Sequence, residues 1–108
     1  MKHCVMADLR FDTPAKNDQM LQAVKDKLVG KLTWGAVNVS KGLSEDNRPT
    51  TGVEVRFDNE ADMDGLFNLI KDKMVQLPVL KGRVSKHFCH HDEGTNHPAC
   101  VIQEEYIK

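Results

Sequence analysis

Two stretches in which apolar and polar residues alternate limit the possible folds of this chain more than any other feature. Each is followed by a stripe of apolar residues at helical spacing. In residues 2–12 an apolar side chain occupies every second position, which is typical of a strand with one buried face. Residues 51–57 repeat this pattern. After each stretch, apolar residues recur at three- and four-residue intervals, as in an amphipathic helix. The chain is therefore expected to combine strands with helices that pack on a sheet.

Residue types at the ends of the periodic stretches support these elements. Thr13-Pro14 provides an N-cap and a first-turn proline for a helix over about 14–31. Asp58 or Asn59 is expected to cap the second helix, which Leu77-Pro78 ends. Two turn-rich segments are expected to be hairpin loops, at 41–49 and 92–97. Strands are predicted over residues 2–12, 34–40, 51–57, 79–91 and 99–107.

This order of elements predicts a ferredoxin-like α+β fold, βαββαβ with an extra C-terminal strand. Two right-handed crossovers in series place both helices on one face of an antiparallel sheet. Numbered along the chain, the strands are expected in the spatial order 4-1-3-2, with the fifth strand beside the fourth. A chain of 108 residues is expected to form one domain, 1–108. The fold itself carries little functional information.

Apolar and charged residues of the first and third strands suggest how these strands pair. If Leu9 lies opposite Val55, apolar residues face each other on the helix side. Lys86 does not fit, because it falls on the helix-facing side of its strand, and a bulge or a departure from the helices would explain it. The same register pairs opposite charges on the bare face, Asp8 with Arg56 and Arg10 with Glu54.

Composition excludes several classes of protein. The 15 Lys and Arg residues nearly cancel the 16 Asp and Glu residues, whereas a dedicated nucleic-acid binder normally has a basic excess. No apolar run approaches the roughly 18 residues of a membrane helix. The N-terminus lacks the apolar core of a signal peptide. We therefore expect no nucleic-acid or membrane partner, and a cytoplasmic protein with reduced thiols.

The C-terminal third of the chain is unusually rich in metal-ligand residue types. Four of the five histidines and two of the three cysteines lie between residues 87 and 100. Strand alternation and antiparallel pairing predict that Cys89 lies opposite Cys100, and that five side chains converge on one side of the sheet. Imidazole and thiolate groups suit Zn²⁺, and also copper or nickel. The candidate metal ligands are Cys4, His87, Cys89, His91 and Cys100.

Two other interpretations of this cluster remain open. In the first, the cysteines are small buried apolar residues and the histidines belong to a solvated hairpin. In the second, Cys89 and Cys100 have a redox or disulfide role.

Charged residues on the bare face form a second candidate site. A carboxylate there could act as a general base, and an arginine could anchor an anionic substrate. Alternatively, these residues are solvated ion pairs that contribute little stability. The candidate ligand-binding residues are Asp8, Arg10, Glu54 and Arg56.

Three kinds of function follow from these features. The leading hypothesis is a small binding or regulatory module that holds a transition metal or small ligand at the His/Cys cluster. One alternative is a homodimeric α/β-barrel-like enzyme that uses the open sheet face on a small anionic substrate. The other is a structural or assembly protein without a small-molecule ligand.

A homodimer is expected because helices on one side leave the other face of the sheet bare.

Overall fold

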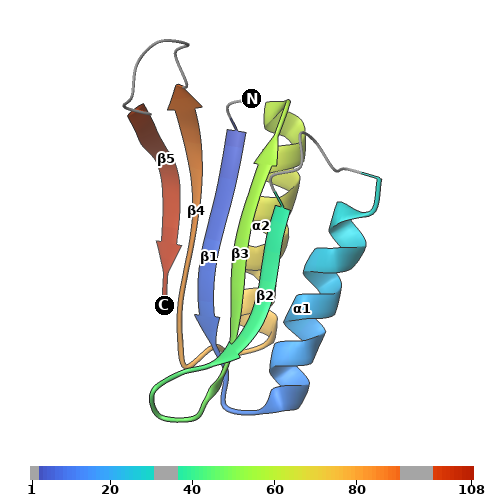
Figure 1. Cartoon of the computed structure of the whole chain (residues 1–108), viewed down its shortest axis with the longest axis vertical. Coiled ribbons are helices and arrows are strands. Elements are labelled where there is room, and N and C mark those ends of the chain that lie inside the picture. The colour runs from blue at the N-terminus through green and yellow to red at the C-terminus, as the bar shows by residue number, and fades with distance from the viewer. Residues whose placement is uncertain (1–2, 31–36, 91–98) are drawn as a thin grey trace.

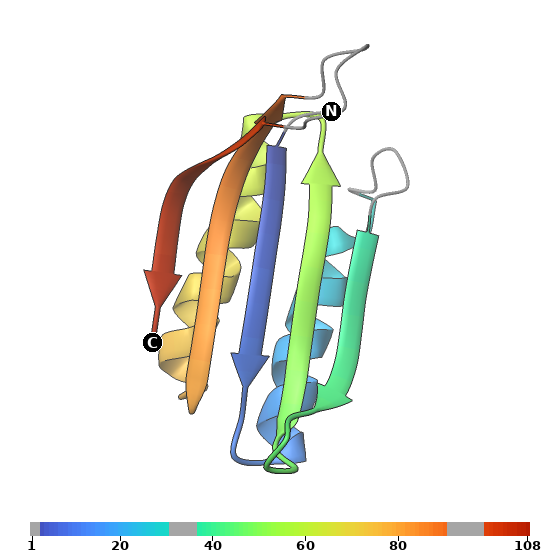
Figure 2. The ribbon, with the colours of Figure 1, turned by 60° about the vertical axis from the view of Figure 1, so that its left-hand side comes forward.

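The described residues form a five-stranded antiparallel sheet with two helices on one face, which is the ferredoxin-like fold (Figure 1 and Figure 2). The computed structural model describes residues 3–30, 37–90 and 99–108, and of residues 37, 89, 90, 99 and 100 it describes the backbone alone. The elements are β1 (His3–Arg10), α1 (Pro14–Leu28), β2 (Val37–Leu43), β3 (Pro49–Phe57), α2 (Glu60–Gln76), β4 (Lys81–His90) and β5 (Ala99–Ile107). The spatial order of the strands, β2-β3-β1-β4-β5, confirms the predicted order.

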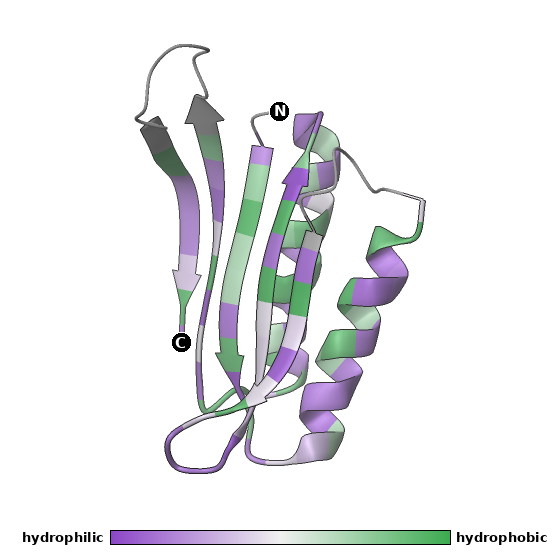
Figure 3. Ribbon diagram, in the orientation of Figure 1, coloured by the Kyte–Doolittle hydropathy of each residue, from purple (hydrophilic) through white to green (hydrophobic). Residues whose placement is uncertain are grey.

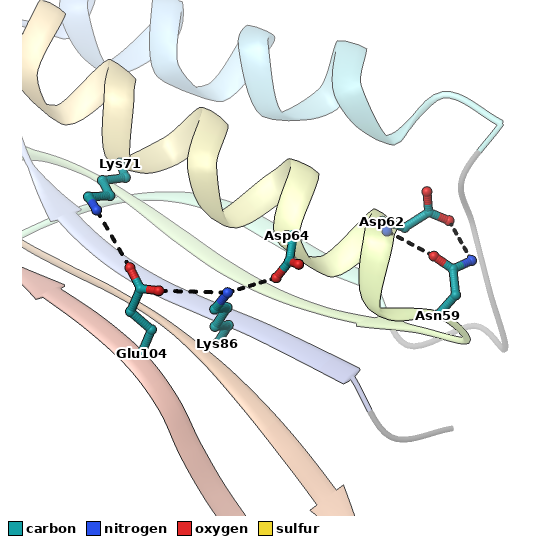
Figure 4. A network of polar contacts seen from close by, with 6 residues as sticks. All are labelled: Asn59, Asp62, Asp64, Lys71, Lys86 and Glu104. Atoms are coloured by element: carbon teal, nitrogen blue, oxygen red, sulfur yellow. Dashed lines mark hydrogen bonds and ion pairs between the residues drawn. The ribbon is translucent and has the colours of Figure 1, made fainter.

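Both helices begin at caps that the sequence predicts. The Thr13 hydroxyl accepts a hydrogen bond from the backbone N–H of Lys16 at 3.3 Å. Asn59, rather than Asp58, caps α2, since its Oδ1 accepts from the backbone N–H of Asp62 at 2.8 Å (Figure 4). These bonds satisfy N–H groups that have no partner inside the helix, so the local sequence sets where each helix starts.

The first hairpin closes later than the sequence predicts. β2 continues to Leu43 and β3 begins at Pro49, so the turn spans 44–48 rather than 41–49. In this turn Asn47 has φ 60°, a left-handed conformation that asparagine tolerates. Polar residues can continue β2 because a strand at the edge of a sheet is open to solvent. The predicted strand positions 34–36 and the predicted loop 92–97 lie outside the described residues.

The hydrophobic core lies between the sheet and the helices. Alternate residues of β1 and β3 are buried on this side, and Figure 3 shows the alternation along β3. No helix among the described residues is long and apolar enough to cross a membrane. The largest fully buried side chains are those of Phe11, Met20, Phe57, Met63, Leu66, Phe67, Ile70 and Met74.

The predicted register of β1 and β3 is wrong by four residues. Val5, rather than Leu9, lies opposite Val55. A shift by an even number of residues keeps every side chain on its predicted face, so alternation alone cannot detect it. The observed register pairs all eight residues of β1. The predicted register would have paired Ala7 with Phe57, where β3 ends, and left the backbone of residues 3–6 without partners.

This shift also removes the predicted charge pairs of the bare face. Asp8 lies opposite Gly52 instead of Arg56. Arg10 lies opposite Thr50 instead of Glu54. The four charged residues therefore do not form a cross-strand ladder.

Lys86 is accommodated on the helix side by acids from two neighbouring elements. Its ammonium group donates a hydrogen bond to Asp64 of α2 at 2.8 Å and lies 3.7 Å from Glu104 of β5 (Figure 4). The same ammonium lies 5.2 Å from the centroid of the Phe67 ring. The pairing of β4 and β5 is irregular between Lys86 and His87. This irregularity agrees with the predicted bulge, which was one of two explanations for the position of Lys86. The network connects β5 to α2.

Replacing Lys86 by methionine is expected to lower the free energy of unfolding by about 1 kcal/mol at neutral pH. The hydrogen bond to Asp64 raises the pKa of Lys86 above its usual 10.5. A raised pKa means that this contribution is complete below pH 10.5 and is lost as the pH rises through the native-state pKa. The difference between wild type and Lys86→Met in urea unfolding should therefore shrink at alkaline pH. An undiminished difference would contradict this, and the exposed Lys25→Met is the matched control.

Candidate functional site

The bare face of the sheet presents two regions of interest, one at each end of β1. The cysteine end comprises Cys4 of β1, His87 and Cys89 of β4, and Cys100 of β5. The hollow is a depression at the other end, where β1 ends and β4 begins.

The register brings together several predicted metal-ligand positions at the cysteine end. Cys4 lies directly opposite His87, and both are buried, with 5% and 9% of their surfaces exposed. Farther along β4, Cys89 lies opposite Cys100 of β5, as the sequence predicts. His91 lies outside the described residues. Four of the five predicted positions thus lie on three neighbouring strands.

His87 is neutral at neutral pH. Its burial lowers its pKa below the usual 6.5, and the positive charge of Arg83 lowers it further, whereas Glu105 acts in the opposite direction. A neutral imidazole is the form that binds metals. The ring Nε2 is 2.6 Å from the Ser85 hydroxyl oxygen, so metal binding through Nε2 requires this hydrogen bond to break. No three metal-ligand side chains gather among those that the structure describes.

Strand geometry limits which of these residues can share one ion. Neighbouring strands are about 4.8 Å apart, and residues two positions apart on a strand are about 6.7 Å apart. Cys4 and Cys100, two strands and one such step apart, therefore have Cα atoms about 12 Å apart. A Zn–S bond of about 2.3 Å keeps the cysteine Cα within about 5 Å of the ion. His87 and Cys89 can thus share an ion with either cysteine, but not with both.

The predicted ligand-binding residues divide between the ends of the face. Arg56 lies opposite Cys4 and is 4.0 Å from Glu54 of its own strand. Arg10 is 3.9 Å from Asp46 of the 44–48 turn. The Asp8 carboxylate makes no hydrogen bond or ion pair with any residue that the structure describes. Only Asp8 and Arg10 of the four line the hollow.

The hollow has a volume of about 810 Å³, and Gly52 of β3 is among its lining residues. Gly52 lies between Asp8 of β1 and Ser40 of β2. A Cβ atom at Gly52 would lie 2.9 Å from the Ser40 hydroxyl oxygen, closer than such atoms approach in proteins. Long side chains from β1 and β4 also line the hollow, including those of Arg10, Lys81 and Arg83.

The hollow contains residues that were not predicted from the sequence as site residues, among them Gly52, Lys81 and Arg83. Each carried a usable signal. A glycine inside a strand often marks a close approach or an open space. Lys81 and Arg83 alternate with residues of the buried side, which places them on the bare face. Their partners, however, depended on the register.

Comparison with known proteins supports the fold and no specific activity. No protein-family model matches the chain, and neither does any curated protein. A candidate antibiotic biosynthesis monooxygenase from Deinococcus radiodurans is 13% identical over 88% of this chain and 97% of its own, with a TM-score of 0.50. A dimeric ferredoxin-like protein from an uncultured marine organism is 8% identical over 88% and 93% of the two chains, with a TM-score of 0.49. The 13% identity of the Deinococcus protein indicates a shared fold alone.

Proposed function

We propose that this chain is a small binding module that holds a transition metal ion of the zinc type at the cysteine end. The backbone register carries the proposal, because it sets Cys4 beside His87 and Cys89 beside Cys100. Thiolate sulfur and neutral imidazole nitrogen are the ligands that Zn²⁺ prefers. The buried, uncharged state of His87 is consistent with this role.

The ligand set consists of His87, Cys89 and one further cysteine. Strand spacing allows Cys4 or Cys100 as the third ligand, as argued above. Three protein ligands leave a fourth position for water, a small molecule or His91, which the sequence also predicts as a ligand. The first test is elemental analysis of the purified protein without a polyhistidine tag, because such a tag would bind the same metals.

Only one of the two variants Cys4→Ser and Cys100→Ser is expected to weaken zinc binding by tenfold or more, about 1.4 kcal/mol. The reason is that thiolates about 12 Å apart in the sheet cannot reach the same ion. Zinc affinity of the reduced protein, measured against a competing chelator, checks this. Equal losses in both variants would contradict the strand-spacing argument.

We also propose that the protein is a homodimer through its bare face. Met6 and Ile102 lie on this face with 45% and 48% of their surfaces exposed, and burying this apolar surface against a second sheet is favourable. Light scattering at about 100 μM, well above the micromolar dissociation constants of specific interfaces, should give twice the chain mass of 12.2 kDa. A mass of one chain would count against the dimer.

A further inference from the structure

Two basic side chains lie directly opposite each other at the end of the bare face that is far from the cysteines. They belong to Arg10 of β1 and Lys81 of β4, and both line the hollow. Like charges in directly opposite positions destabilise a strand pair. Arg10 is only 3.9 Å from Asp46, and the two side chains are 38% and 56% exposed. Lys81 forms no side-chain hydrogen bond or ion pair with the described residues, so Asp46 contacts Arg10 and no described acid contacts Lys81.

A hydroxyl group and open space adjoin the two basic groups. Thr50 of β3 lies opposite Arg10 on the side away from Lys81, and it also lines the hollow. Gly52 also lines the hollow, and Ser40 approaches it so closely that a side chain there would clash. A guanidinium, an ammonium and a hydroxyl that face one cavity form a donor set suited to a carboxylate or phosphate.

Asp8 provides an acceptor two residues away from this donor set. Its register neighbours are Gly52, which has no side chain, and Arg83. Arg83 is already engaged, since its guanidinium lies 2.6 Å from the Glu105 carboxylate. The Asp8 carboxylate is exposed and makes no ion pair with a described residue. It is about 6.7 Å along the strand from Arg10, within the span of a small molecule.

We propose that the hollow binds a small organic molecule that has a carboxylate or phosphate at one end and an ammonium or hydroxyl group at the other. The oxyanion contacts Arg10 and Lys81, and the donor group contacts Asp8. The volume of about 810 Å³ lies within the usual range of small-molecule sites, about 300–1,000 Å³. Lys41 takes no part, because its ammonium is 3.0 Å from Asp18 of α1. Arg10 is about 20 Å along β1 from Cys4, so the site is independent of the proposed metal.

Matched probe pairs test both halves of the proposal by titration in two-dimensional NMR. The pairs are 2-aminoethyl phosphate with ethyl phosphate, and 3-aminopropanoate with propanoate. We expect all four to shift the backbone amide signals of residues 8–10 and 81–83. Within each pair the ammonium compound should bind about tenfold more tightly. This advantage should disappear in Asp8→Asn. Comparison between the pairs shows whether phosphate or carboxylate is preferred.

Further variants distinguish binding of the probes in the hollow from nonspecific electrostatic binding. Lys81→Ala should weaken all four probes by about tenfold. Lys25→Ala, at an exposed position of α1, should change nothing. Gly52→Val should remove binding by filling the hollow. Two results would overturn the site. One is the absence of shifts at about 10 mM probe, a concentration far above the roughly micromolar dissociation constants of specific sites. The other is a set of shifts that Lys81→Ala leaves unchanged. Equal binding within each pair would overturn the role of Asp8.

Discussion

Cys89→Ser is expected to weaken zinc binding to the reduced protein by at least about a hundredfold. Losing an outer-shell partner of a metal ligand already costs roughly ten- to a hundredfold, and this change removes a ligand itself. Cys89 belongs to both ligand sets that the strand spacing permits, so no other cysteine can replace it. Competition with a chromophoric chelator measures the affinity. Binding should also weaken as the pH falls, because protons compete for the thiolates and the imidazole.

Ser85→Ala is the matched control for this experiment. It removes the hydroxyl that is bonded to His87 Nε2, and it leaves all the proposed metal ligands in place. Zinc binding of this variant should equal or exceed that of the wild type. If Cys89→Ser binds zinc as tightly as the wild type does, the metal site does not exist.

Gly82→Val is expected to lower the free energy of unfolding by about 1–3 kcal/mol, the usual cost of overpacking a core. A Cβ atom at this position would lie 2.9 Å from Met74 Cε, 3.0 Å from Leu9 Cδ2 and 3.2 Å from Val79 Cγ2. Valine adds two further methyl groups to this crowded space. For a domain of about 100 residues, each kcal/mol corresponds to roughly 4–8 °C in melting temperature.

Lys81→Val provides the comparison for Gly82→Val. It changes the adjacent residue, which is exposed and lies on the bare face. Its effect on the free energy of unfolding should stay within about 0.5 kcal/mol. Thermal and urea unfolding measure both variants. Equal stability of Gly82→Val and wild type would mean that β4 does not approach α2 as closely as the structure indicates.

Local sequence patterns are sufficient to predict the elements of this protein and the face on which each residue lies. The alternation around Val5 and Val55 decides which side of a strand is buried, and it does so within a few residues. Thr13 and Asn59 cap their helices through groups only three residues away. Hairpin geometry likewise allowed the pairing of Cys89 with Cys100 to be predicted from residues close in sequence.

The register of β1 against β3 is set by contacts between distant parts of the chain, and the hollow depends on this register. Strand faces are the same after a shift of four residues, so the choice depended on pairing all eight backbone positions of β1 with residues forty or more positions away in the chain. The acids that pair with Lys86 also come from other parts of the chain, Asp64 from α2 and Glu104 from β5. Local patterns depend on residues that are close together in the sequence. Lys81 and Thr50, in contrast, are neighbours of Arg10 because distant segments pair in the sheet.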